Sequence, residues 1–259
     1  MASSSTGQNG LQIDQAVREG WAAFCRAPWP FVLFTLISGA LSLAFQALAN
    51  LASLPEASQP PAALIVLATL VGSLGHLVVT LWGTVGLIRG AWSALEGRRP
   101  NLGSFLRWDG GAAGRLLLRQ LLFALLVFAI VLPAALLAVG FSQLQPWLAA
   151  LPLLVALLLL IYLAVGQTFL PWVALLGGEG PTASLQRGRR VVDRQWWMVL
   201  LLVVVQSAIL LAGALLCGVG LLAAAPLSLC VTTAAYRQLF GSEDRTGLLS
   251  PPLNPPLNG

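Results

Sequence analysis

The chain has 259 residues, of which 58% are hydrophobic and only 9% are charged. Soluble domains usually carry about 25% charged residues, so this composition excludes an ordinary water-soluble domain and favours a protein solvated by lipid. The net charge is +5, and all fourteen basic residues are arginines. In a membrane protein such a charge marks cytoplasmic loops rather than a nucleic-acid site.

The N-terminal part contains a polar stretch and then an amphipathic one. Residues 1–10 are polar, and we expect them to be disordered. Over residues 11–27 the apolar side chains recur at helical spacing, with charged side chains elsewhere on the wheel, which predicts an interfacial helix. The apolar positions are Ile13, Val17, Trp21 and Phe24. Pro28 and Pro30 then break the chain direction, and Trp29 between them is typical of an interfacial anchor.

Six apolar stretches follow, each long enough to cross the hydrocarbon layer of a membrane. The predicted spans are about 31–54, 63–88, 116–139, 147–176, 197–216 and 221–236. The last two share an uncharged run, residues 198–236, in which Gly218 to Gly220 form the predicted turn. A single kinked or re-entrant segment over the same run is the alternative. Residues 241–259 are polar and proline-rich, and we expect a disordered tail.

The arginines are distributed asymmetrically between the segments that connect the spans. All fourteen lie in segments that six spans would place on one side of the membrane, and the three segments on the other side carry none. Because cytoplasmic loops are enriched in arginine, both termini are predicted to be cytoplasmic. The expected fold is all-α: a polytopic membrane helix bundle over residues 11–240, with six transmembrane helices and amphipathic cytoplasmic helices.

Two segments before predicted spans resemble each other at an offset of 168 residues. Residues 17–31 read VREGWAAFCRAPWPF and residues 185–199 read LQRGRRVVDRQWWMV. The matched pairs are Val17 and Leu185, Gly20 and Gly188, Phe24 and Val192, Arg26 and Arg194, and Trp29 and Trp197. Residues 102–118 occupy the same place before the third span with a poorer match. The pattern predicts three units of interfacial helix plus membrane hairpin, through duplication or through convergence on interfacial chemistry.

The second predicted span has unusual faces. One consists almost entirely of glycine, a stripe of hydroxyl and imidazole groups runs beside it, and leucine fills the rest. Small residues let helices approach closely, and hydroxyl groups can hydrogen-bond across the contact. We therefore expect the glycine and polar faces to point into the bundle and the leucine face toward lipid. The glycine face is Gly72, Gly75, Val79, Gly83, Gly86 and Gly90, the polar stripe Thr69, Ser73, His76, Thr80 and Thr84, and the leucine face Leu67, Leu70, Leu74, Leu77, Leu81 and Ile88.

His76, with Ser73 and Thr80, is a candidate intramembrane polar site. An ionisable group at this depth is a functional hypothesis by default, as a gate, a proton carrier or a ligand contact. The alternative is a neutral imidazole hydrogen-bonded to Ser73, Thr80 or a neighbouring helix. We favour this alternative because no carboxylate lies within any predicted span.

Four arginines before the fifth span form a second candidate site. Arg187, Arg189, Arg190 and Arg194 are candidate contacts for anionic lipid headgroups, since each base near an anionic surface contributes about 1 kcal/mol. Topological anchoring is the alternative. With a single histidine and three cysteines whose spacing matches no metal framework, we expect no metal, no cofactor and no catalytic residues.

Three blocks carry a resemblance to a known family. They are AVREGWAAFCRAPWPFVL at the start, ASLQRGRRVVDRQWWMVLLL before the fifth span and PLSLCVTTAAYRQLF at the end of the sixth. Together they resemble the bacterial six-span proteins related to the membrane domain of glycerophosphodiester phosphodiesterases and to YciC-like inner-membrane proteins. The resemblance implies an integral protein of a bacterial inner membrane, or an equivalent internal membrane, without a catalytic domain. The soluble phosphodiesterase barrel is absent, so that activity and its residues do not carry over.

The leading hypothesis is a non-enzymatic membrane protein that interacts with lipid or organises a complex through its arginine-rich cytoplasmic face. The alternative is a small permease or lipid transporter that uses the polar stripe of the second span, and a third hypothesis is a membrane enzyme that uses His76. The expected partners are the lipid bilayer, with anionic phospholipid, and a membrane protein, but no nucleic acid.

Overall fold

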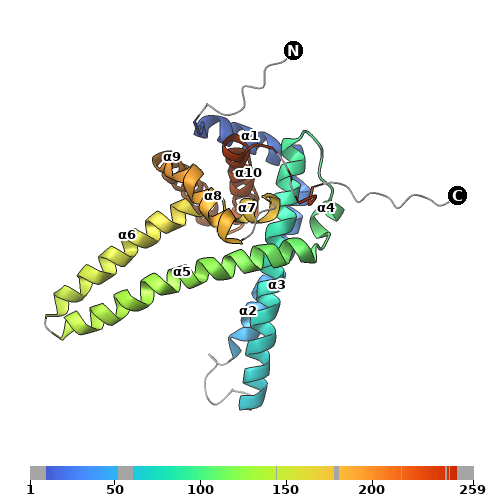
Figure 1. Cartoon of the computed structure of the whole chain (residues 1–259). Coiled ribbons are helices and arrows are strands. Elements are labelled where there is room, and N and C mark those ends of the chain that lie inside the picture. The colour runs from blue at the N-terminus through green and yellow to red at the C-terminus, as the bar shows by residue number, and fades with distance from the viewer. Residues whose placement is uncertain are drawn as a thin grey trace. The chain divides into compact units, whose positions relative to one another are not determined.

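The computed structural model describes residues 10–51, 61–143, 145–177, 181–216, 218–242, 244 and 246–249, and every regular element within them is a helix (Figure 1). The all-α prediction is therefore confirmed. The chain divides into two compact units. The α2–α3 unit consists of residues 14–113, 206–235 and 248–259, and the α5–α6 unit of residues 1–13, 114–205 and 236–247.

The helices follow one another with short connections. The α2–α3 unit holds α1 (Ile13–Arg26), α2 (Pro28–Ala49), α3 (Ala62–Leu95) and α4 (Leu102–Leu106), with the second half of α9 (Trp196–Leu215) and most of α10 (Leu221–Phe240). The α5–α6 unit holds most of α5 (Gly110–Ser142), the short 3-10 helix η3 (Pro146–Ala149), α6 (Ala150–Gly166), α7 (Leu170–Leu176), α8 (Pro181–Asp193) and the first half of α9.

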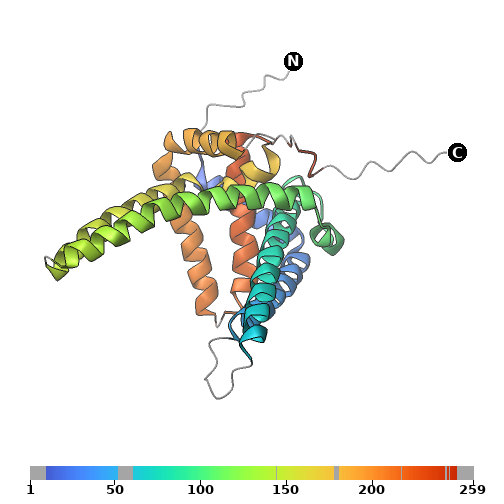
Figure 2. The same ribbon diagram turned by 60° about the horizontal axis from the view of Figure 1, so that its bottom comes forward.

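Among the described residues, five helical stretches are long and apolar enough to cross a membrane, and they correspond to the first five predicted spans. They are Pro28–Ala49, Ala62–Leu95, Gly110–Ser142, Trp147–Leu176 and Trp196–Leu215. The uncharged run 198–236 forms two helices, α9 and α10, joined by a turn at Gly218 with a φ of +78° (Figure 2). The predicted turn is therefore confirmed. A sixth span stays a prediction, because α10 is not among the stretches that are apolar enough.

Two predicted spans differ from the helices that form. The second was expected to end at residue 88, before the charge of Arg89, but α3 continues to Leu95. The fourth was expected to be continuous, yet it breaks between α6 and α7 at residues 167–169. Pro171 explains the break, since a proline has no N–H to donate and its ring clashes with the carbonyl of the residue four positions earlier.

The helix predicted over residues 11–27 forms as α1, and its interfacial location stays a prediction. The buried residues are Ala16, Gly20, Ala23 and Phe24, whereas Trp21 is exposed. A Cβ atom on Gly20 would lie only 2.6 Å from the backbone nitrogen of Val231 on α10. The small residues of α1 therefore pack against protein, because they allow this close approach, and the large apolar residue faces outward.

The repeat predicted from the sequence is matched in the helix boundaries. Shifted by 168 residues, the first residues of α1 and α2 fall on Pro181 and Trp196, which begin α8 and α9. The matched positions also share environments, because Gly20 and Gly188 are both buried and Trp29 and Trp197 are both exposed. Each of the hairpins α2–α3, α5–α6 and α9–α10 follows a shorter helix or helical turn.

The two predicted disordered ends fall largely outside the described residues. Residues 1–9 and 250–259 lie outside them entirely. Within the predicted tail, Thr246 donates a hydrogen bond of 2.6 Å from its hydroxyl group to the carbonyl oxygen of Leu175, and Leu248 is buried. Thr246 is thus held against the end of α7.

Candidate functional site

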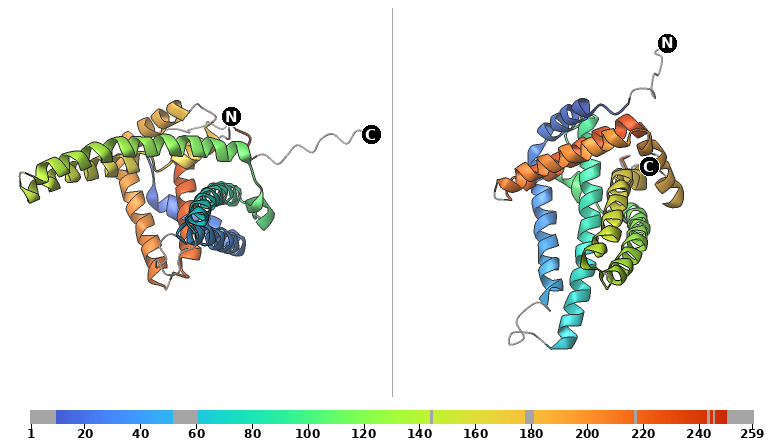
Figure 3. Two further views of the ribbon diagram at one scale, coloured as in Figure 1. Left: turned by 90° about the horizontal axis from the view of Figure 1, so that it is seen from below. Right: turned by 90° about the vertical axis from the view of Figure 1, so that its left-hand side faces the viewer.

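The glycine face of α3 packs against protein, as the sequence predicts. A Cβ atom on Gly72 would lie 2.4 Å from the backbone nitrogen of Ala49 on α2, and one on Gly90 would lie 2.1 Å from the ring of Phe105 on α4. Real side chains cannot approach so closely. Glycine therefore lets α2 and α3 lie side by side as a hairpin, which Figure 3 shows, and gives α4 a place on α3.

An aromatic cluster fixes α4 against that hairpin. The Phe105 ring lies 5.0 Å from that of Phe31 and 5.4 Å from that of Phe34, measured between centroids. Trp82 packs on Phe34 at 4.9 Å and donates a hydrogen bond of 3.1 Å from its indole nitrogen to the carbonyl oxygen of Leu106. The arginine-rich segment after α3 is therefore anchored through a buried phenylalanine that sequence reasoning missed.

The polar stripe of α3 contacts α2 through two of its members, which confirms only part of the prediction: the Thr69 hydroxyl group donates to the carbonyl oxygen of Ala49, and His76 bonds to Ser42. Ser73 and Thr80 are exposed. The hydroxyl group of Thr80 donates to the carbonyl oxygen of His76 in its own helix at 2.8 Å, so it needs no partner from another helix. The leucine face is also only partly outward, since Leu81 and Ile88 are buried. The second half of α3 is surrounded by protein on all sides, with buried residues on every face.

His76 forms a hydrogen bond with Ser42 on α2, a residue that the sequence analysis did not consider. The Nδ1 atom of His76 lies 2.9 Å from the hydroxyl oxygen of Ser42. A serine beside an imidazole is the start of a nucleophile–base pair, but such a pair also needs an orienting group and oxyanion donors. In the described residues no carboxylate lies in either helix of the pair. The arrangement therefore corresponds to the second interpretation in the sequence analysis, in which the imidazole is hydrogen-bonded to a neighbouring helix.

This interpretation predicts the effect of removing the imidazole. We expect His76→Ala and Ser42→Ala each to lower the free energy of unfolding by about 1 kcal/mol, because each removes one interhelical hydrogen bond. The double variant should be little worse than either single variant. Unfolding in micelles of increasing dodecyl sulfate content, followed by circular dichroism, measures all three. Additive losses would contradict the pairing of the two side chains.

Arg89 is buried where α3 leaves the predicted span. Its Nη1 atom donates to the carbonyl oxygen of Arg107 at 2.9 Å and to that of Ser104 at 3.4 Å. Its Nη2 atom lies 3.9 Å from the Oδ2 atom of Asp109. The Oδ1 atom of Asp109 accepts a hydrogen bond from the backbone N–H of Ala112 and so caps α5. The guanidinium thus ties the α4 segment to α3. This explains why the helix continues beyond the predicted end of the span.

The predicted headgroup arginines, three on α8 and Arg194 directly after it, have different environments. Arg189 pairs with Asp193 at 3.6 Å and donates to the hydroxyl oxygen of Tyr162 on α6 at 3.3 Å. Its guanidinium carbon also lies 5.4 Å from the centre of the Tyr162 ring. Arg190 and Arg194 are exposed. The side chain of Arg187 lies outside the described part of the structure.

The class of this protein follows from its fold alone, because the comparisons with known proteins add nothing to it. No protein-family model, no curated protein and no solved structure matches the chain. Nor does the described part of the chain bring three or more histidine, cysteine or carboxylate side chains together for a metal ion. The chain is an all-α membrane protein, and the residues that the structure describes include five helical stretches long and apolar enough to cross a bilayer.

Proposed function

We propose that this is a non-enzymatic membrane protein that binds anionic phospholipid, and through it organises its surroundings, along an arginine-rich cytoplasmic face. We place it in a bacterial inner membrane, or an equivalent internal membrane, with both termini in the cytoplasm. The resemblance to the six-span phosphodiesterase-membrane-domain and YciC-like proteins agrees with this proposal. A membrane-protein partner at the same face remains part of it.

One observation carries the proposal: an exposed tryptophan lies next to an arginine before or at three predicted spans. Trp29 is 80% exposed, Trp108 53% and Trp197 74%, whereas Trp92 in the protein core is almost completely buried. The arginines that accompany the exposed rings are Arg26, Arg107 and Arg194. Tryptophan rings favour the headgroup level of a bilayer, and arginines at that level attract anionic lipid. Each pair supports contact with charged headgroups near the start of its own predicted span.

The test uses the two exposed arginines of the α8 segment. We expect Arg190→Gln with Arg194→Gln to lower the occupancy of bound phosphatidylglycerol by roughly tenfold or more, since each base contributes about 1 kcal/mol at an anionic surface. Native mass spectrometry of the protein in mild detergent, titrated with phosphatidylglycerol or phosphatidylcholine, measures the occupancy. Added salt should weaken phosphatidylglycerol binding in the wild type.

The matched control keeps the charge. Arg190→Lys with Arg194→Lys should retain most of the phosphatidylglycerol, because the attraction depends mainly on charge at the membrane surface. If the glutamine variant holds phosphatidylglycerol as well as the wild type does, or loses phosphatidylcholine to the same extent, the proposed lipid-binding face is wrong.

A further inference from the structure

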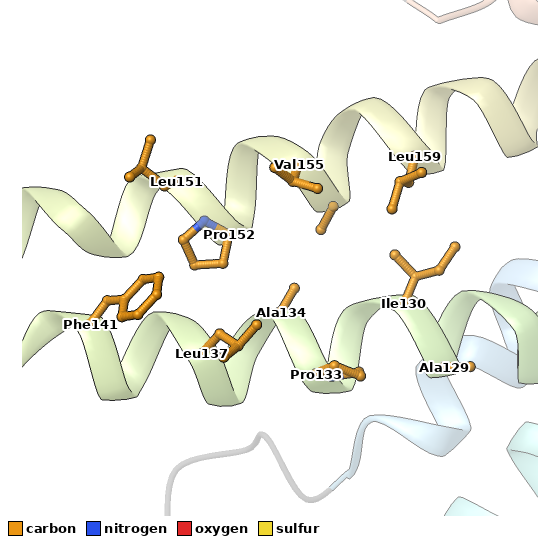
Figure 4. A pocket seen from close by; sticks show the side chains of 11 residues that line it. Ala129, Ile130, Pro133, Ala134, Leu137, Phe141, Leu151, Pro152, Val155 and Leu159 are labelled. Carbon is orange, nitrogen blue, oxygen red and sulfur yellow. The ribbon is translucent and has the colours of Figure 1, made fainter.

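The α5–α6 hairpin has an apolar pocket of about 480 Å³ (the α5–α6 cavity) that opens outward between its two helices. Figure 4 shows Ile130 on α5 near Leu159 on α6 at one end and Phe141 near Pro152 at the other, with Ala134 projecting from α5 between them. The complete lining is Ala129, Ile130, Pro133, Ala134, Leu137, Phe141, Leu151, Pro152, Val155, Ala156 and Leu159.

Two small side chains line the cavity where the helices face each other: Ala134 on α5 and Ala156 on α6 are both buried there. Most of the larger lining side chains, among them Leu137 and Val155, are exposed, so the cavity is open to the surroundings of the hairpin. Its volume lies in the range of ligand pockets, about 300–1,000 Å³.

The surroundings of the cavity indicate that the occupant is hydrocarbon. No lining side chain carries a polar group, and a site without polar partners does not hold ordered water. The two stretches that form the cavity are also the most apolar of the five candidate spans. In a bilayer such a cavity opens to acyl chains. From Ile130 to Phe141 the helix rises about 16 Å, a length that suits an extended chain.

A polar group for a headgroup lies one helical turn beyond the cavity. Tyr162 follows Leu159 by three residues on α6, which places it about one turn further along the same side of the helix. Its hydroxyl group accepts a hydrogen bond from Arg189 and lies 3.0 Å from Asp193. The Arg189 side chain is still 59% exposed, and a guanidinium has five N–H donors, so donors remain for a phosphate oxygen.

We infer that this hairpin binds one membrane phospholipid, with an acyl chain in the α5–α6 cavity and its phosphate at the Arg189–Tyr162 pair. The site shares Arg189 with the four arginines predicted to contact headgroups, but it depends mainly on burial of the acyl chain and not on the net charge of the headgroup. It therefore accepts phosphatidylcholine as well as phosphatidylglycerol. A lysophospholipid with a single chain satisfies it equally.

The test fills the cavity. With 1-palmitoyl-lysophosphatidylcholine as the probe, native mass spectrometry of the full chain should show one retained molecule per wild-type protein. Ala134→Leu with Ala156→Leu should lower this retention roughly tenfold or more. Ala135→Leu, the same enlargement at an exposed neighbouring position, should leave it unchanged. Equal retention by the filled variant and the wild type, or equal loss by the Ala135 control, would overturn the inference.

A measurement on the wild type alone tests the inference even if the filled variant misfolds. Across lysophosphatidylcholines of increasing chain length, retention should rise until the chain fills the cavity and then level off. Retention that keeps rising with every added methylene would indicate non-specific partitioning and overturn the cavity site. Neither experiment depends on Arg190 or Arg194, so the cavity site and the arginine-rich face can fail independently.

Discussion

Replacing Gly72 with alanine should force α2 and α3 apart and lower the free energy of unfolding by about 3 kcal/mol. The added Cβ atom would lie 2.4 Å from the backbone nitrogen of Ala49 and 2.6 Å from the carbonyl oxygen of Phe45. Both atoms belong to the backbone of α2, so no side-chain rotation can relieve the clash. Separation would also weaken the hydrogen bond that the Thr69 hydroxyl donates to the carbonyl oxygen of Ala49.

The control for this substitution is Gly39→Ala in the middle of α2. A Cβ atom there would meet nothing within 4 Å, so the same chemical change adds helix propensity without a clash. We expect it to be neutral or to stabilise the protein by up to about 1 kcal/mol. Unfolding in dodecyl sulfate micelles, followed by circular dichroism, compares the two variants with the wild type. Equal effects at both positions would show that close packing of the hairpin does not contribute to stability.

The spans and their packing face could be predicted because lipid imposes strong constraints on sequence. A helix must supply a long apolar run to cross the hydrocarbon, and a glycine stripe on one side marks the close contact. The structure accordingly places the stripe of α3 against α2 and α4. The turn at Gly218 was predictable for a similar reason, since its positive φ favours glycine.

The partners across each contact were not predictable, because they depend on which helices meet. His76 stood out as the only histidine, but nothing in the local sequence distinguishes Ser42 from the other hydroxyl residues of α2. A signal for Phe105 did exist: it is the aromatic residue of a short helical segment that Asn101 caps. Part of the polar stripe was misjudged because threonine hydroxyl groups in a helix can bond to their own preceding turn.

Arg89 shows the same limit for charged residues. Its charge predicted the end of the second span, because an arginine in hydrocarbon is costly. That argument considers only lipid as the surroundings. In the structure the carbonyl oxygens of Ser104 and Arg107 both accept from the Nη1 atom of the guanidinium, and they come from a segment that follows α3 in the sequence. Only the folded connection between α3 and α5 makes this burial possible.

Replacing Arg89 with leucine should therefore be strongly destabilising, by about 2–4 kcal/mol. The substitution leaves the carbonyl oxygens of Ser104 and Arg107 without their donor and removes the cationic partner of Asp109. Arg89→Lys should recover only part of the loss, because an ammonium group cannot reproduce the planar fork that reaches two carbonyl oxygens and a carboxylate. The same unfolding assay in dodecyl sulfate micelles measures both variants.

Two comparisons separate the contributions at Arg89. Arg98→Leu removes an exposed arginine whose ion pair with Glu96 is on the surface, so its effect should stay within about 0.5 kcal/mol. Asp109→Asn keeps an oxygen that can cap α5 but removes the charge. Since the Arg89–Asp109 distance is 3.9 Å, we expect a loss of less than about 1 kcal/mol. If Asp109→Asn costs as much as Arg89→Leu, the ion pair and not the carbonyl contacts holds α4 in place. If Arg89→Leu costs no more than Arg98→Leu, Arg89 does not anchor the segment at all.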